Sequence, residues 1–285
     1  ILARALSMSG SAIVGSLFFE FLIPELVICF ILSYAIGLCV GIYNSSYQKR
    51  TGPIFKFGLL KDLFGYAYKM YLSGLLINLN NYIANTFIII LGVPSQITFY
   101  ALAQQFAQIL LKIIDSLNTF IFPIATKKND VDSTEFIAKA FRVAMVIMVP
   151  LGILSSLGIF PAIYLFYGAE YLPIVSLFLI LLPGIVSSSI AGTILMYFMS
   201  SGRPEIITKT LVIPVVLQLG LGFLVIPIYG IKGAAGILSF GMIIASLTQL
   251  IFFLKTTKLH FARSMIAGKN DLITVLNFVR STLKI

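Results

Sequence analysis

A row of polar residues follows one face of an otherwise apolar segment, residues 97–123. At about 100° per residue these polar side chains share one arc of a helix. We call them the polar stripe: Gln104, Gln105, Gln108, Lys112, Asp115, Ser116 and Thr119. A charged side chain in lipid costs roughly 2.5–3.5 kcal/mol even on lenient insertion scales, so such residues normally face a protein interior or a water-filled cavity. The stripe therefore predicts a polar path through a membrane.

The two charged members of the stripe suggest different chemistries. Lys112 and Asp115 are spaced i,i+3, so they can pair on one helix face and neutralise each other. A lysine ammonium that faces a cavity is a point-charge site for phosphate. The aspartate can instead bind a coupling ion, H⁺ or Na⁺, as carboxylates inside membranes often do. The spacing alone does not choose among these three interpretations.

The preceding apolar segment, residues 66–92, carries several amides. A narrow arc holds Asn78, Asn81 and Asn85, and roughly opposite lie Lys69, Ser73 and Asn80. Amides donate to and accept from sugar hydroxyls, but they also bond one membrane helix to another. The turn at Gly92–Ser95 makes the two segments antiparallel neighbours. The asparagines are therefore either part of the same polar path or contacts between helices.

Composition places most of this chain in lipid. Of its residues 59% are hydrophobic and only 11% are charged, whereas about a quarter of an average soluble domain is charged. The net charge of +10 lies mainly in short loops and the tail, which predicts membrane topology and no nucleic-acid partner. Cys29 and Cys39 are about 15 Å apart along one helix and cannot pair within it.

Eight apolar segments approach the ~20 residues that span a bilayer: roughly 2–19, 22–44, 66–92, 97–123, 141–163, 172–199, 208–227 and 233–254. This predicts an all-α integral membrane fold. Basic residues lie in alternate connections, and only Lys232 breaks the alternation. Positive residues mark the cytoplasmic side, so we expect both termini in the cytoplasm. Because the chain starts at Ile1, we expect it to be a piece of a longer membrane protein.

Motifs of common enzyme classes are missing from the sequence. It contains no GxxxxGK[ST] phosphate loop, so it does not read as a P-loop ATPase. With one histidine and two cysteines, no zinc site is readily assembled. The outer connections offer only Glu20, Glu25 and Glu170 as acidic groups. We therefore expect no enzyme activity, no catalytic residue, no metal and no cofactor, with the coupling ion left open.

Several short motifs resemble one transporter family. The run Ile226–Gly236 resembles the IP-x-x-G-x-x-GAA turn of bacterial polysaccharide flippases, which carry O-antigen or capsule repeat units. Their superfamily also holds multidrug exporters and peptidoglycan-precursor flippases. Further similar patterns follow the family's order: Phe99–Ala103, Phe122–Pro123, Phe166–Tyr171 and Ser201–Pro204.

The resemblance implies a transporter of two six-helix bundles. Residues 1–44 would be the last two helices of an N-terminal bundle that lacks its first four helices here. An amphipathic cytoplasmic connector, 45–65, would lead to a complete C-terminal bundle, 66–254, and a basic tail, 255–285.

The activity implied is flipping of an undecaprenyl-pyrophosphate-linked oligosaccharide from the cytoplasmic to the outer leaflet of the bacterial inner (cytoplasmic) membrane, by alternating access. Lys112 would meet the pyrophosphate, the glutamines and asparagines would meet sugars, and the lipid tail would stay in the bilayer. Asp115 would modulate Lys112 or couple an ion. The partners expected are the bilayer, the lipid-linked oligosaccharide and other polysaccharide assembly proteins.

Other functions remain open at this point. An ion-coupled multidrug exporter of the same fold would prefer carboxylates in its cavity, and only Asp115 qualifies. A non-transporting partner, or a truncated remnant, within a polysaccharide assembly complex is a second alternative. A membrane-embedded sugar polymerase or transferase is a third, although the outer side lacks candidate catalytic residues.

Overall fold

Long helices make up the part of the chain that the computed structural model describes, residues 35, 57–90, 96–126 and 130–257. No strand occurs in these ranges. The elements in order are α3 (Phe57–Ile90), α4 (Ile97–Ala125), α5 (Asp130–Phe166), the 3-10 turn η2 (Ala169–Tyr171), α6 (Pro173–Ser200) and α7 (Pro204–Thr257). The predicted segments 2–19 and 22–44, apart from residue 35 and including both cysteines, and most of the basic tail lie outside the described residues.

The helices extend beyond the apolar segments that predict them. α3 begins at Phe57, so residues 57–65 of the expected connector are the first turns of this helix. α5 begins at Asp130, well before the apolar segment 141–163. Acidic residues such as Asp130 stabilise a helix start because they oppose the positive end of the helix dipole. Hydropathy marks only the most apolar stretch of each helix, and turns that contain charged residues, such as Lys61 and Asp62 in α3, extend it.

α7 is two helices joined by a tight bend. Gly230 has φ 57° and ψ −137°, a backbone conformation open almost only to glycine. The bend lies within the Gly-rich run Ile226–Gly236, between the predicted segments 208–227 and 233–254. We call residues 204–229 the first arm of α7 and residues 231–257 its second arm. The six apolar segments expected between residues 66 and 254 are therefore all helical.

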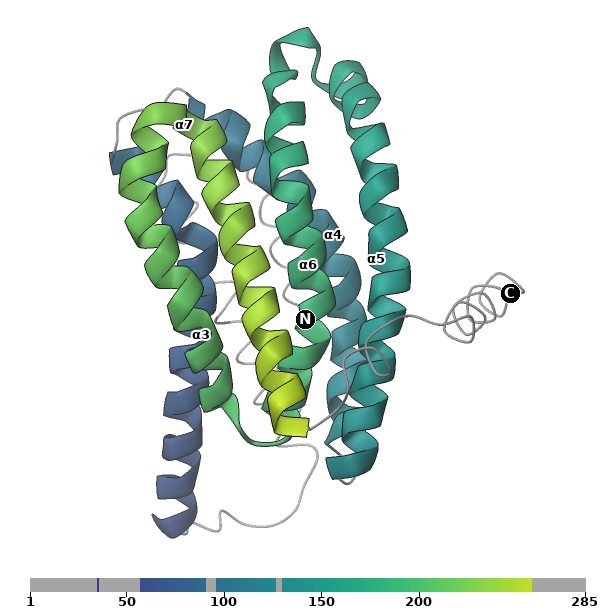
Figure 1. The fold of residues 1–285 in the computed structure, drawn as a ribbon, viewed down its shortest axis with the longest axis vertical. Coiled ribbons are helices and arrows are strands. Elements are labelled where there is room, and N and C mark those ends of the chain that lie inside the picture. The colour runs from purple at the N-terminus through teal and green to yellow at the C-terminus, as the bar shows by residue number, and fades with distance from the viewer. Residues whose placement is uncertain (1–34, 36–56, 91–95, 127–129, 258–285) are drawn as a thin grey trace, which may run out of the picture. The chain divides into compact units, whose positions relative to one another are not determined.

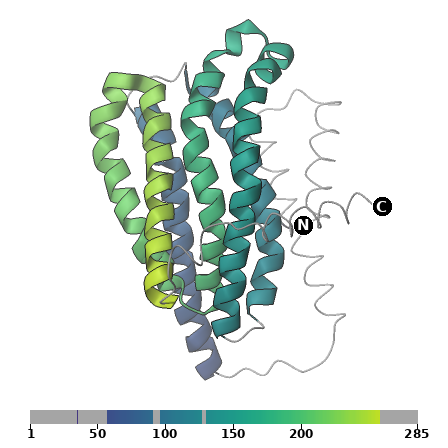
Figure 2. The same ribbon diagram turned by 45° about the vertical axis from the view of Figure 1, so that its right-hand side comes forward.

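The helices form an elongated bundle in which successive helices run in opposite directions (Figures 1 and 2). α6 packs against α4, α5 and α7 and is the most deeply buried of the apolar helices. The start of α3, the α4–α5 link, the α6–α7 link and the end of α7 all lie at one end of the bundle (Figure 1). Arg203, Lys209 and Lys255 belong to that end.

Four described helices are long and apolar enough to cross a membrane: α4, α5, α6 and α7. The chain is therefore of the multi-pass membrane type. α3 is not among them, and its four asparagines between residues 78 and 85 explain its lower apolar character. Those amides must find partners if α3 lies in lipid, because hydrocarbon offers none.

Polar contacts join α3 to the first arm of α7, and one of them gives an asparagine of α3 its partner. Lys69 forms an ion pair with Glu205 at 3.6 Å. The Ser73 hydroxyl lies 3.0 Å from that of Thr208, and Gln218 Nε2 donates to Asn80 Oδ1 at 2.7 Å. The sequence separations of the last two pairs are nearly equal, 135 and 138. Residue numbers therefore increase in the same direction along both helices, which run parallel. The polar residues on this side of α3 are therefore contacts between helices.

Candidate functional site

The polar stripe lies on the open side of α4. Tyr100, Ala103, Ala107, Leu110 and Ile114 are buried and place the opposite side of the helix in the bundle core. Gln108 is half-buried. The exposed residues of the stripe are Gln105, Lys112, Asp115, Ser116 and Thr119. The predicted face is thus a continuous polar surface along the helix, directed away from the core.

Lys112 lies near the middle of α4, roughly 20 Å from either helix end at 1.5 Å per residue. Lys112 and Asp115 are exposed, and within the described part of the chain no ion pair joins them. The Ser116 and Thr119 hydroxyls donate to the backbone carbonyls of Lys112 and Asp115, both at 2.9 Å. The ammonium and the carboxylate are therefore both available to a ligand.

Gln104 differs from the other residues of the stripe because it is buried against α3. Asn85 Nδ2 donates to Gln104 Oε1, and Gln104 Nε2 donates to the Asn81 carbonyl, both at 3.3 Å. These bonds join α3 to α4, so Gln104 and Asn85 serve as contacts between helices in this structure. We call Asn81, Asn85 and Gln104 the α3–α4 seam.

The polar residues of the α4 open face lie on the side next to the α3–α4 seam. Gln104 stands at the edge that touches α3, and the remaining stripe follows directly around the helix. The exposed Ile109, Ile113 and Phe120 come next around the helix. Phe120 lines a pocket together with residues of α5. Phe106, beyond these three residues, contacts the ring of Tyr167 after α5 at 5.9 Å between centroids. The polar half of the open face therefore adjoins α3.

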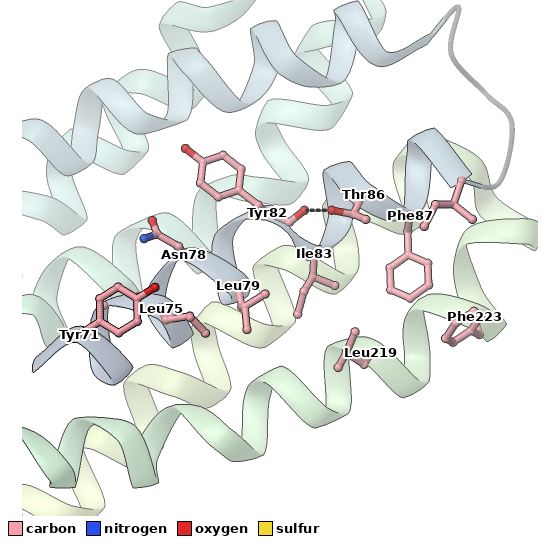
Figure 3. Close-up of a pocket in the computed structure, with 12 residues that line it drawn as sticks. Tyr71, Leu75, Asn78, Leu79, Tyr82, Ile83, Thr86, Phe87, Leu219 and Phe223 are labelled. Carbon is pink, nitrogen blue, oxygen red and sulfur yellow. Dashed lines mark hydrogen bonds between the residues drawn. The ribbon is translucent and has the colours of Figure 1, made fainter. Parts of the chain in front are cut away.

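Asn78 is exposed and lies outside the seam. It lines a groove of about 650 Å³ between α3 and the first arm of α7, which we call the α3 groove (Figure 3). Tyr71 and Tyr82 line the same groove and are largely exposed. Neither tyrosine was predicted as a site residue, although the two stand seven residues before and four residues after Asn78, on the same helix face.

Two buried amides were also not selected as site residues. Asn118 is buried on α4, and its Oδ1 has no hydrogen-bond partner. Gln218 is fully buried and uses only its Nε2. No charged residue accompanies either amide in the contacts above. Each amide sits where two helices meet, so their role is packing specificity rather than substrate contact.

A polar face on a bundle that holds four helices long and apolar enough to cross a membrane is typical of a multi-pass membrane protein. Over residues 5–176 the sequence matches the family described as polysaccharide biosynthesis protein. The match covers more than half of the 285 residues, and the chain belongs to this family. The matched range contains α3, α4 and therefore the whole polar stripe. Neither the curated proteins nor the solved structures gave a match.

Proposed function

We propose that this protein flips an undecaprenyl-pyrophosphate-linked oligosaccharide from the cytoplasmic to the outer leaflet for surface polysaccharide synthesis. The observation that carries the proposal is Lys112, an exposed lysine midway along a membrane-length helix of a polysaccharide biosynthesis protein, with no acidic partner among the described residues. An unpaired cation at that depth is costly in lipid alone. An anionic ligand that passes through the membrane would offset this cost.

Each part of the open face has a role in this proposal. Lys112 attracts the pyrophosphate as a compact point charge. Gln105, Gln108 and Asn78 exchange hydrogen bonds with sugar hydroxyls, because an amide both donates and accepts. Asp115 tunes the charge of Lys112 or takes up H⁺ or Na⁺. The seam residues Asn81, Asn85 and Gln104 hold α3 and α4 at the angle that presents these groups.

The proposed setting is the bacterial inner membrane, with the basic end of the bundle and both termini in the cytoplasm. Residues 66–254 act as one six-helix bundle, and preceding helices supply the facing half of a two-bundle transporter. Alternating access moves the glycan between the two sides without breaking a covalent bond, so the protein acts without a catalytic residue. Other polysaccharide assembly proteins supply and consume the lipid-linked oligosaccharide.

An ion-coupled multidrug exporter of the same fold is a second candidate. The exposed position of Asp115, with no cationic partner among the described residues, favours it, because a carboxylate in a cavity binds cationic drugs. Removal of this carboxylate by Asp115→Asn separates the two functions. It abolishes drug efflux in an exporter, whereas a flippase retains binding of the pyrophosphate substrate.

The substitution Lys112→Gln tests the flippase proposal in the intact protein. It removes the positive charge and keeps much of the side-chain length. Loss of a charge-assisted contact predicts a fall in flipping rate of about tenfold or more. The measurement is outward movement of a fluorescent undecaprenyl-pyrophosphate oligosaccharide in proteoliposomes, read by quenching from outside.

Two matched variants control this test. Lys209→Gln removes an exposed lysine from the start of α7 and leaves flipping at the parental rate. Lys112→Arg keeps the charge and retains most of the activity, since both cations attract pyrophosphate. Equal rates for the parent protein and Lys112→Gln, with both folded, would remove Lys112 from the path. No flipping by the folded parent across varied glycans and ion gradients would reject the proposal.

A further inference from the structure

The α3 groove combines an apolar side with a polar edge. Leu79 and Ile83 are directed toward the first arm of α7, whereas Asn78 and Tyr82 are directed to the other side (Figure 3). Of the described residues, none that lines the groove is charged. Its volume of about 650 Å³ lies within the range of roughly 300–1,000 Å³ for small-molecule sites. The groove is thus large enough for a ligand that is mostly hydrocarbon.

Specific contacts shape this groove. Phe87 of α3 and Phe223 of α7 meet edge to face, with ring centroids 4.8 Å apart. Phe87 also packs onto Gly222, where a Cβ atom would lie 2.6 Å from its ring, so the two helices approach closely there. At Gly74, in the first half of α3, an added Cβ would meet nothing within 4 Å. The groove is therefore closed by aromatic rings near one end and stays open beside Gly74.

The polar edge of the groove adjoins the polar stripe. Around the axis of α3, Asn78 follows directly after the Asn81 and Asn85 positions that bond to α4. Around α4, the stripe begins directly after Gln104 on the other side of the same seam. The stripe and the groove thus flank one line of contact between two helices. A molecule with an anionic head, a polar glycan and a hydrocarbon chain would meet both surfaces.

We propose that the α3 groove holds the isoprenoid chain of the lipid-linked substrate while its pyrophosphate lies at the polar stripe; this rests on the proposed function. An uncharged groove on a membrane bundle suits a hydrocarbon chain, since no charged lining group would lose solvation. Continuity with the stripe distinguishes the substrate chain from bulk lipid tails, which carry no glycan. Asn78 and Tyr82 lie at the junction between chain and head. The lipid tail is thus guided by the protein rather than left in the bilayer.

Gly74→Leu is the variant that tests this proposal, because the new side chain fills the groove from an open position. Gly220→Leu is its matched control, since Gly220 is an exposed glycine of α7 with open space around it and does not line the groove. The probe is an undecaprenyl-pyrophosphate oligosaccharide with a photoreactive diazirine in its chain. It is presented to the intact protein in vesicles of phosphatidylethanolamine and phosphatidylglycerol.

The expected result is labelling concentrated on groove residues of α3 and α7. Gly74→Leu lowers that labelling by about threefold, the scale of one packing contact inside a membrane, and Gly220→Leu leaves it unchanged. A phosphatidylethanolamine with the same diazirine labels the groove no more than the exposed face of α5. Equal groove labelling by the two lipids, or labelling spread over all exposed faces, would overturn the proposal.

A short-chain probe separates this proposal from the proposed function. A pyrophosphate oligosaccharide on a two-isoprene chain is expected to bind in a Lys112-dependent manner and to be indifferent to Gly74→Leu. The short-chain probe can bind in this Lys112-dependent manner while the long-chain probe does not label the groove. In that case the groove proposal fails and the flippase proposal stands. If Lys112→Gln affects neither probe, both proposals fail.

Discussion

Gly184→Ala is expected to destabilise the bundle by about 3 kcal/mol, near the upper end for overpacking by one methyl group. An added Cβ at Gly184 of α6 would lie 2.6 Å from Ser239 Cα and 2.7 Å from the Ser239 carbonyl oxygen. Both atoms belong to the backbone of α7, so no side-chain rotation relieves the overlap. The two helices must separate, and the hydrogen bond from the Gly184 N–H to Ser239 Oγ, 3.1 Å long, is lost.

The measurement is the midpoint of thermal unfolding in detergent. It is determined from the fraction of protein that stays monodisperse after heating. Gly220→Ala is the control, because a Cβ there meets nothing within 4 Å, and it keeps the parental midpoint. Adding Ser239→Gly does not restore stability, since the obstructing atoms are backbone. Restoration by that second change, or an unchanged midpoint for Gly184→Ala, would show that α6 and α7 are not in backbone contact.

Gly241→Ala is expected to cost about 2 kcal/mol through a different contact. A Cβ at Gly241, on the second arm of α7, would overlap Nε2 of the buried Gln218. That nitrogen is the donor to Asn80 Oδ1 on α3. The Gln218 side chain must therefore move. Its hydrogen bond to Asn80 is then lost, and both buried amides lack that partner. Loss of stability follows from broken polar contacts as well as from crowding.

A double-mutant cycle identifies this mechanism. Gln218→Ala removes the obstructing amide and is itself destabilising, because Asn80 loses its partner. In that background Gly241→Ala adds less than about 0.5 kcal/mol, since the three atoms nearest to the added Cβ all belong to the Gln218 side chain. The same unfolding measurement reads all four proteins. Full additivity of the two costs would show that the crowding at Gly241 does not involve Gln218.

The glycine variants are expected to lower stability, whereas Lys112→Gln is expected to lower the flipping rate without lowering stability. Gly184 and Gly241 lie at helix contacts, so their variants reduce transport through the amount of folded protein. Lys112 is exposed and has no acidic partner in the part of the chain that the structure describes, so its replacement leaves the unfolding midpoint near the parental value. Flipping rate per folded protein therefore separates a positioning effect in the core from a substrate contact on the open face.

The sequence by itself determined the features that depend on local periodicity. The polar stripe of α4 shares one face because side chains repeat every 3.6 residues in any helix, whatever surrounds it. The resemblance of Ile226–Gly236 to a family turn predicted a break between the segments 208–227 and 233–254, and the structure has a bend there at Gly230. Apolar length predicted the helices between residues 66 and 254, while residues 57–65, assigned to the connector, are the first turns of α3.

Only the tertiary structure decided which polar groups are open to a ligand. Asn78 and Asn85 are chemically identical and share one face of α3, yet Asn85 bonds to Gln104 and Asn78 lines a groove. The groove itself needs Phe223, far along the chain, beside Phe87. Periodicity assigns a residue to a face of its own helix, but the neighbour that covers that face is set by packing among all the helices.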